Sequence, residues 1–285
     1  MQTNDISAKL LNADAQSWID KPCQVLLIQD KGKGNVKNYT AELILLFKYY
    51  NGKTVADITA DDIQQYIVYI KTVHLLDRAK CRSVASACAF FYKQIIKIPY
   101  ALPSALYPQK EFILPNIMSQ QEVTQLFAAP LTLRKYCVIG LLYGSGLRIS
   151  EVAALRIPDI ESAAKRIKVV QGNGAKDRYT LLAANLADKL RQYYVAAKRP
   201  PQYLFTSAQT GKADHPRSMQ LVVTEAMNKA GFIQKGYTSH TLRHSFATHM
   251  LDNGSSIHVI KTLLGHSKLE TTMVYLHLQQ HTQFG

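Results

Sequence analysis

Five side chains in the second half of the chain have types and spacings that suit one reaction. They occur in three runs, GSGLRISE with Arg148, SHTLRHSFATHML with His240 and Arg243, and LLGHSKLETTMVY with His266 and Tyr275. Arginine and histidine side chains can hold the oxygens of a phosphodiester through charge-assisted hydrogen bonds. A tyrosine hydroxyl, with an ordinary pKa of about 10, can attack phosphorus when an acceptor or a positive field favours loss of its proton. The set predicts cleavage of a DNA strand without a metal ion.

Two residues of the second run are expected to act together. His240 and Arg243 are three positions apart at the start of a predicted helix and therefore share a face. His244 and His249 follow on the same helix, and we expect both to be structural. A metal site built from these histidines is disfavoured, because no carboxylate joins them at a suitable spacing.

Two further residues would complete such a site. Glu151, three positions after Arg148, is expected to hold that guanidinium in place rather than to react. Lys176 lies just beyond a tight turn at 172–174, between two runs that predict a β-hairpin. A lysine on a hairpin loop could reach a leaving oxygen and protonate it. Arg178, the next basic residue, is predicted to contact DNA.

The charge balance favours a polyanionic partner. The chain has 285 residues, a formal net charge of +14 and an isoelectric point of about 9.5. Residues 1–116 contain 14 Lys and Arg against 10 Asp and Glu, whereas residues 117–285 contain 20 against 10. The basic excess is therefore concentrated where the chemistry is predicted, and nucleic acid is the expected partner.

Cysteine usage and hydropathy indicate the compartment. The four cysteines form no C-x-x-C pair and no zinc-finger spacing with histidine, so reduced thiols are expected. The N-terminal residues do not resemble a signal peptide, and no run is apolar enough to span a membrane. We expect a cytoplasmic protein, associated with the nucleoid and not with a membrane.

Hydrophobic periodicity predicts a mainly helical chain with a small antiparallel sheet. Residues 1–100 read as a helical DNA-binding domain, with a helix capped by Thr59. Four prolines break the pattern and predict a linker at 101–116. Residues 117–285 form the predicted catalytic domain, which starts with a capping box at Ser119. From Leu186 onward the chain is predicted to be mainly helical, ending in a short helix capped near Ser267.

Basic side chains occur along much of the N-terminal domain. Any one of them is most simply a solvated surface residue, but as a set beside a cleavage domain they could grip phosphates. Those predicted to contact DNA are Lys31, Lys33, Lys37, Arg78, Lys80 and Arg82.

The four motifs LLYGSGLRISEV, GNGAKDR, SHTLRHSFATHML and LLGHSKLETTMVY agree in order and spacing with a known family. The chain resembles the tyrosine recombinases, also called the phage integrase family, and is most similar in manner to the Xer and integron-integrase branches. The motifs cover about residues 117–278. The first hundred residues match only in kind, as a helical core-binding domain.

The resemblance implies a role for each motif residue. Arg148 and Arg243 would clamp the scissile phosphate, and His240 and His266 would hydrogen-bond it, with His240 also a candidate acceptor for the tyrosine proton. Lys176 would protonate the departing 5′-hydroxyl, Glu151 would support the site, and Tyr275 would attack phosphorus. The product would be a 3′-phosphotyrosyl bond.

The resemblance also implies partners and a cycle. Rejoining would need no metal, ATP or other cofactor, and two rounds of exchange through a Holliday junction would recombine two specific DNA sites. Family members act as a homo-tetramer on two duplexes, with the two domains forming a C-shaped clamp. A monomer or dimer without DNA, and accessory proteins, are compatible with this expectation.

Three features depart from the family pattern. Asn173 stands where relatives often carry a lysine, and ten residues follow Tyr275, fewer than in many Xer-like members. A short tail puts cyclic exchange of a terminal helix between subunits in doubt. The chain also lacks, between about 185 and 215, the long insertion that marks integron integrases.

Several functions remain open at this level. A recombinase could be a mobile-element integrase or a chromosome-dimer resolvase. A type IB topoisomerase would share the cleavage chemistry but relax supercoils as a monomer. A DNA-binding regulator with an inactive site belongs to another class, and replacing Tyr275 by phenylalanine would leave only that function intact.

Overall fold

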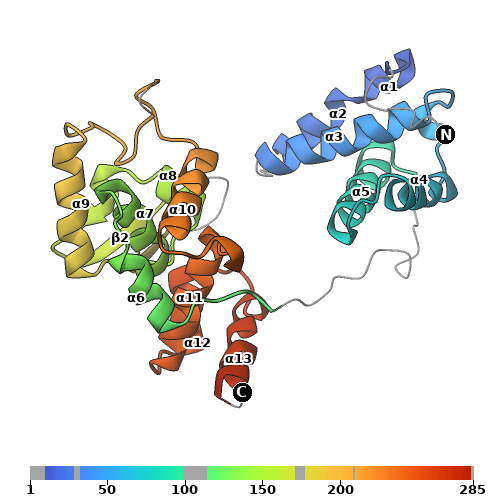
Figure 1. The fold of residues 1–285 in the computed structure, drawn as a ribbon. Coiled ribbons are helices and arrows are strands. Elements are labelled where there is room, and N and C mark those ends of the chain that lie inside the picture. Colours follow the sequence, from blue (N-terminus) through green and yellow to red (C-terminus); the bar gives the residue numbers. More distant parts are fainter. Residues whose placement is uncertain (1–9, 29–32, 99–113, 171–176, 208, 284–285) are drawn as a thin grey trace. The chain divides into compact units, whose positions relative to one another are not determined.

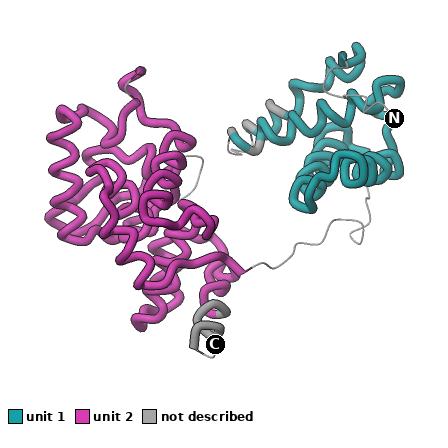
Figure 2. Tube along the Cα trace, in the orientation of Figure 1, with its two compact units in different colours: residues 1–112 teal, residues 113–285 magenta. Residues whose placement is uncertain are grey.

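The computed structural model describes residues 10–28, 33–98, 114–170, 177–207 and 209–283. The chain divides into two compact units, residues 1–112 and 113–285, called here the N-terminal and C-terminal units (Figure 1 and Figure 2). Most of the predicted linker falls on residues 99–113, which lie outside the described residues.

The N-terminal unit is helical wherever it has regular structure in the described residues. Its helices are α1 (Ala13–Trp18), α2 (Asp20–Ile28), α3 (Lys33–Tyr49), α4 (Ala60–Thr72) and α5 (Arg78–Phe91). A 3-10 turn, η2 (Val55–Asp57), precedes α4, and a π-helical turn, η3 (Tyr92–Ile96), follows α5. Thr59 caps α4 as predicted, forming a reciprocal capping box with Asp62.

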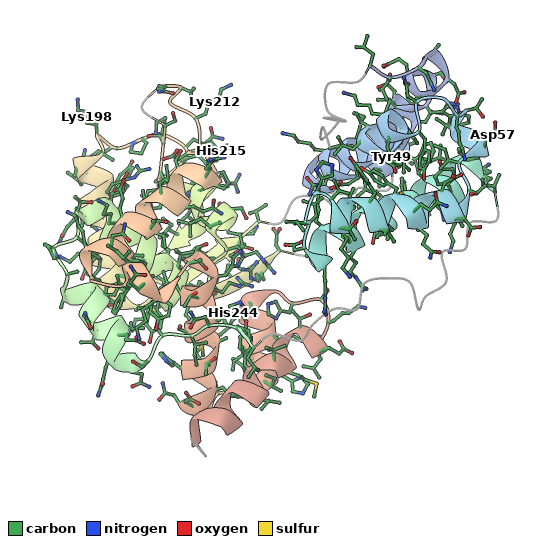
Figure 3. The ribbon with its side chains drawn as sticks, turned by 45° about the vertical axis from the view of Figure 1, so that its right-hand side comes forward. Tyr49, Asp57, Lys198, Lys212, His215 and His244 are labelled. Carbon is green, nitrogen blue, oxygen red and sulfur yellow. The ribbon has the colours of Figure 1, made fainter. Side chains whose placement is uncertain are left out.

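Aromatic side chains fill much of this unit. The ring of Tyr49, at the end of α3, lies with its centroid 4.7–5.1 Å from those of Tyr50, Tyr66 and Tyr69 (Figure 3). Trp18 packs edge-on against Phe91 at a centroid distance of 6.2 Å. Such offset contacts add specificity to the burial of apolar area, so the unit has a core of its own.

The C-terminal unit contains the remaining helices. They are α6 (Gln120–Ala128), α7 (Leu133–Gly144), α8 (Ile149–Ala153), α9 (Ala184–Ala196), α10 (Pro216–Lys229), α11 (Ser239–Asp252), α12 (Ile257–Leu264) and α13 (Glu270–Gln283), with 3-10 turns η5 (Ile157–Asp159) and η6 (Ile233–Lys235). Ser119 forms the predicted capping box with Glu122 at the start of α6. The mainly α fold class with a small antiparallel sheet is confirmed.

One helical expectation needs correction. The last helix starts at Glu270, after a turn, rather than from a cap at Ser267, and it runs for 14 residues. The chain after Leu186 is mainly helical in the described residues, as expected, and its long connection between α9 and α10 includes isolated bridges such as Arg156 with Tyr203.

The predicted hairpin is part of a three-stranded antiparallel sheet in the order β1 (Ile160–Glu161), β2 (Arg166–Val169), β3 (Arg178–Leu181). The alternation along β3 is opposite to the usual one, because its polar residues are buried and its apolar ones are exposed. Arg178 and Thr180 point inward, whereas Tyr179 and Leu181 are more than two-fifths exposed. The turn of the hairpin, residues 171–176, lies outside the described residues.

Helices α11, α12 and α13 pack against one another at one end of the C-terminal unit (Figure 1). Their shared core includes Phe246, Ile260, Leu264 and Tyr275. This arrangement brings the runs SHTLRHSFATHML and LLGHSKLETTMVY together.

Three findings concern other classes of site. Within the described parts of the chain, no helix is long and apolar enough to cross a membrane. The same residues contain no cluster of three His, Cys, Asp or Glu side chains suited to a metal ion. Cys81, Cys88 and Cys137 are free and buried, and burial raises the pKa of the Cys88 and Cys137 thiols to about 12.

Candidate active site

Arg148 is placed by a close approach between the chain after α7 and two C-terminal helices. Gly146 has a φ of +62°, and a Cβ there would lie 2.5 Å from the Phe246 ring and 3.1 Å from Leu264. Only glycine fits this turn, because it combines a left-handed backbone with contact against α11 and α12. Arg148 follows two residues later as the N-cap residue of α8.

Glu151 connects three arginines. Its carboxylate accepts hydrogen bonds from the backbone N–H and Nη1 of Arg148, at 2.7 and 2.9 Å. It also accepts two from Arg178, at 2.9 and 2.8 Å, and lies 3.8 Å from Nη1 of Arg243. Burial raises the pKa of Glu151, but the hydrogen bonds and charges of Arg178 and Arg148 outweigh it and hold the pKa below its ordinary value. Glu151 is therefore an ionised anchor for the guanidinium groups.

The prediction that Arg178 contacts DNA needs correction. Its side chain is 5% exposed, and its Nε donates to the Leu263 carbonyl at 2.8 Å while both terminal nitrogens bind Glu151. Because its planar fork is already occupied, Arg178 holds the carboxylate and joins β3 to α12 rather than presenting donors to a ligand.

Arg243 is also buried, with a side chain that is 5% exposed. Its Nη1 donates to the Gly146 carbonyl, and its Nη2 donates to the Leu264 carbonyl at 2.7 Å. Burial lowers its pKa to about 10, and the positive charges of Arg148 and Arg178 act in the same direction while Glu151 opposes them. Arg243 therefore stays charged at neutral pH inside a site with an excess of positive charge.

His266 lies beside Arg243 at the end of α12. Gly265, with a φ of +66°, caps that helix in the left-handed conformation, as the sequence predicts. His266 Nε2 is 3.4 Å from Nη2 of Arg243, and its Nδ1 is 3.0 Å from the Thr272 hydroxyl. Burial, followed by the charges of Arg243 and Arg148, lowers the pKa of His266 to about 4, so its imidazole is neutral.

Tyr275 lies on α13 and is 1% exposed. Its ring is nearly parallel to that of His266 at a centroid distance of 6.4 Å. Burial raises the pKa of the Tyr275 hydroxyl to about 12, although the charges of Arg243 and Arg148 lower it. The phenol is therefore protonated at rest, in the positive field of two arginines.

His244, which the sequence predicts to be structural, contacts the candidate nucleophile. Its Nδ1 is 2.9 Å from the Tyr275 hydroxyl, so it contacts the atom predicted to react. Figure 3 shows His244 among the C-terminal helices of its unit. The spacing contained a signal for this, because His240 and His244 are four apart and share a helix face. Their ring centroids are 6.4 Å apart, and His240 itself is exposed.

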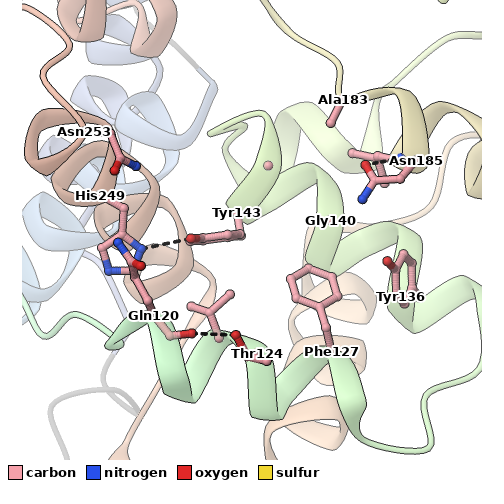
Figure 4. A pocket seen from close by; sticks show the side chains of 13 residues that line it. Gln120, Thr124, Phe127, Tyr136, Gly140, Tyr143, Ala183, Asn185, His249 and Asn253 are labelled. Carbon is pink, nitrogen blue, oxygen red and sulfur yellow. Dashed lines mark hydrogen bonds between the residues drawn. The ribbon is translucent and has the colours of Figure 1, made fainter.

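His249, near the other end of α11, makes a similar contact elsewhere. Its Nδ1 is 2.9 Å from the Tyr143 hydroxyl. Both side chains line a cavity of about 560 Å³ between α6, α7 and the start of α9, together with Phe127, Tyr136 and Asn185 (Figure 4). This pair lies away from the arginine cluster, as expected for a structural histidine.

Some of the residues that are predicted to contact DNA are among the described residues. Lys31 and the predicted acid Lys176 lie outside the described residues, and Lys33 is placed only by its backbone on α3. Lys37, Arg78 and Arg82 are exposed on α3 and α5. Lys80 forms an ion pair with the buried Glu42, so part of its charge is already compensated.

The described core of the site thus holds three guanidinium groups against one carboxylate. Arg148 is its open member, with a side chain that is 36% exposed, whereas those of Arg178 and Arg243 are 5% exposed. Such an unbalanced positive cluster with a tyrosine and two neutral histidines at its edge suits an oxyanion whose charge grows during reaction.

Comparisons with known proteins agree with this chemistry. The family model for the phage integrase family matches residues 116–282, more than half of the chain. A tyrosine recombinase of Pseudothermotoga lettingae is 33% identical over 258 residues, which cover 88% of this chain and 87% of that protein. Tyrosine recombinase XerD of Rickettsia bellii is 29% identical over 272 residues, which cover 85% and 89%.

Solved structures show the same fold. The crystal structure of XerA recombinase is 25% identical with a TM-score of 0.54, and the match covers 95% of this chain and 99% of that one. The post-cleavage complex of XerH site-specific recombinase with palindromic difH DNA is 18% identical with a TM-score of 0.71, covering 95% and 83%. The chain therefore belongs to the phage integrase family, the tyrosine-type site-specific recombinases.

Proposed function

We propose that this recombinase cuts duplex DNA at specific sites with Tyr275 as the nucleophile. The observation that carries the proposal is the position of Tyr275 beside an arginine cluster with only one compensating carboxylate. The phenolic oxygen attacks phosphorus, forms a 3′-phosphotyrosyl bond and releases a 5′-hydroxyl. A 5′-hydroxyl of the partner duplex then reverses the step, and two rounds through a Holliday junction recombine two sites.

Each residue of the site has a role in this proposal. Arg148 and Arg243 neutralise the nonbridging oxygens, whose charge increases in the pentavalent transition state. His266 and His240 hydrogen-bond the same phosphate, and Lys176 protonates the leaving 5′-oxygen. Glu151 positions the arginines through the bonds described above. The phosphotyrosyl bond conserves the energy of the phosphodiester, so neither ATP nor a metal ion takes part.

The DNA partner is supported by charge and by structural similarity. The net charge of +14 favours a polyanion, and the similar XerH structure is a complex with its difH substrate. We propose that both units bind the duplex as a clamp, with Lys31, Lys33, Lys37, Arg78, Lys80 and Arg82 near phosphates. A homo-tetramer on two duplexes in the cytoplasm, within the nucleoid, completes the proposal, with a mobile element or the chromosome as the DNA substrate.

The decisive experiment is a search for the covalent intermediate. Wild-type protein and Tyr275→Phe are incubated with nicked suicide duplexes tiled from DNA that flanks the gene, and the products are separated on denaturing gels. We expect an adduct with the wild type alone, formed in the presence of a chelator. Binding of these duplexes by both proteins without any adduct would contradict the proposal. Relaxation of any supercoiled plasmid, with no specific site, would favour a topoisomerase instead.

A further inference from the structure

Helix α11 carries two histidines that each meet a tyrosine hydroxyl, and their surroundings differ. His244 Nδ1 lies 2.9 Å from the Tyr275 oxygen, and His249 Nδ1 lies 2.9 Å from the Tyr143 oxygen. The first pair lies beside the arginine cluster. The second lines the cavity of Figure 4, outside that cluster. The two hydrogen bonds have the same length, so only their electrostatic surroundings can make one of them reactive and the other structural.

The direction of the His244 bond follows from the two protonation states. Burial lowers the pKa of His244 to about 4, so the imidazole is neutral, and burial raises the pKa of Tyr275 to about 12, so the phenol keeps its proton. The tyrosine O–H therefore donates and Nδ1 of His244 accepts. The hydrogen of the neutral ring is then on Nε2. An acceptor lone pair already lies in line with the proton that cleavage must remove.

The charges that face His244 explain how it can become a stronger base. They are His240 and Arg243 on its own helix, His266 after α12 and Tyr275 on α13; both His240 and Arg243 lower its pKa. Arg148 and Arg243 also act on Tyr275. An anionic phosphate bound between these arginines would offset their charge and favour a proton on His244. Substrate binding would thus raise the basicity of His244 when it is needed.

We propose that His244 accepts the proton of Tyr275 during strand cleavage and returns it during rejoining; this inference rests on the function proposed above. In the forward step the tyrosine O–H bond breaks, a bond from hydrogen to Nδ1 forms, and the freed oxygen pair forms the bond to phosphorus. The bond from phosphorus to the 5′-oxygen breaks, and that oxygen takes a proton from the general acid. In the reverse step the imidazolium protonates the departing phenolic oxygen.

This assignment replaces the expectation that His240 receives the tyrosine proton. His240 is exposed, and its ring centroid lies 6.4 Å from that of His244. His240 then remains free to hydrogen-bond the phosphate. The two histidines lie four positions apart on one helix face. His244 acts on the nucleophile, and His240 acts on the phosphate.

The test compares three glutamine variants, which keep an amide acceptor but remove the basic nitrogen. His244→Gln, His240→Gln and the matched control His249→Gln are each mixed with the nicked duplex on which the wild type forms its adduct, and single-turnover rates are followed from pH 6 to 10. We expect His244→Gln to slow adduct formation by about 100-fold or more at pH 7. Its rate should rise with pH beyond the wild-type plateau, because hydroxide must then ionise the phenol. His249→Gln should react like the wild type.

A modified substrate distinguishes proton removal from the tyrosine from proton donation to the leaving oxygen. When the 5′-bridging oxygen is replaced by sulfur, the thiolate leaves without a proton, so a defect in general acid catalysis disappears. The His244→Gln defect should persist on this duplex, and added imidazole should restore part of the rate of His244→Ala. Circular dichroism and a DNA-binding isotherm for each variant check that folding and affinity are retained.

The outcomes are separable. An unchanged rate in His244→Gln, a faster one, or a defect that vanishes on the sulfur-containing duplex overturns the role of His244 while leaving the recombinase function intact. A defect confined to His240→Gln returns the acceptor role to His240. Absence of any wild-type adduct removes the proposed function, and the inference with it.

Discussion

The C-terminal unit buries two arginines at its candidate site, whereas the ion pairs described in the N-terminal unit bury only the acid. In the N-terminal unit the acid is the buried member of the ion pairs Lys80–Glu42 and Lys53–Asp62, with side chains 5% and 12% exposed, while the lysines are about two-fifths exposed. In the C-terminal unit Arg178 and Arg243 are themselves buried, around Glu151. An acid paired with one exposed lysine leaves no unbalanced charge inside. Three guanidinium groups around one carboxylate leave a positive cluster that an anion would complete.

The largest expected effect concerns the nucleophile. Tyr275→Phe should abolish the covalent adduct, because it removes the hydroxyl that is proposed to attack, whereas Tyr143→Phe should form it at close to the wild-type rate. Both tyrosines bond a histidine of α11, so the pair is a matched comparison. The measurement is the denaturing gel described above, and an adduct in Tyr275→Phe would show that another residue attacks.

The next effect tests the open arginine. Arg148→Ala should slow cleavage by about 10²–10³-fold, since it removes one charge contact to the transition state. Arg148 is one-third exposed, so most of the fold should survive. Arg82→Ala, which removes an exposed cation of the N-terminal unit, should leave the rate at saturating DNA unchanged. Single-turnover adduct formation gives both rates, and wild-type cleavage by Arg148→Ala would refute the assignment of the site.

A third prediction addresses stability. Glu151→Gln should lower the free energy of unfolding of its unit by about 3 kcal/mol, because buried guanidinium groups lose their counterion. Glu42→Gln should cost about 1 kcal/mol, because the lysine left behind is exposed to water. Trp18, the only tryptophan, belongs to the N-terminal unit, so its fluorescence in urea follows that unit while circular dichroism follows both. Equal losses would contradict the comparison.

Lowering the pH should destabilise the C-terminal unit more than the N-terminal unit. The pKa values of His244 and His266 are lowered by burial to about 4 in the folded C-terminal unit, against about 6.5 in an unfolded chain. Between these values the unfolded chain binds more protons, so stability is complete above pH 6.5 and falls as the pH decreases towards 4. With partial exposure discounted, the loss is on the order of 2 kcal/mol. Urea titrations at pH 7 and 5 should shift the circular dichroism transition more than the Trp18 transition.

The smallest effect belongs to the surface of the N-terminal unit. Lys37→Ala removes one exposed cation, so DNA affinity should fall a few-fold and the slope of log affinity against log salt should decrease by about 1. Cleavage at saturating DNA should not change. Fluorescence anisotropy at several salt concentrations measures the slope, and an unchanged slope would place Lys37 away from the phosphates.

Particular residues show which features local sequence patterns can predict. The capping boxes at Thr59 and Ser119 and the left-handed Gly265 follow from short-range rules and lie where the sequence predicts them. Strand β3 does not obey such a rule, because its buried Arg178 and Thr180 find partners elsewhere in the fold. Thr180 donates to the Ser145 carbonyl at 2.6 Å, and Arg178 reaches Glu151. A polar residue turns inward when a distant partner satisfies it.

The sequence by itself determined the chemical types of the site, the mainly helical fold class and the family, since these depend on residue identity, periodicity and motif spacing. Only the tertiary structure decided that Arg178 is a buried anchor and that His244 meets the Tyr275 hydroxyl. The physical reason is that burial and hydrogen-bond partners come from residues far apart in the chain. His244 and Tyr275 are 31 positions apart, and the packing of α11 against α13 sets their contact.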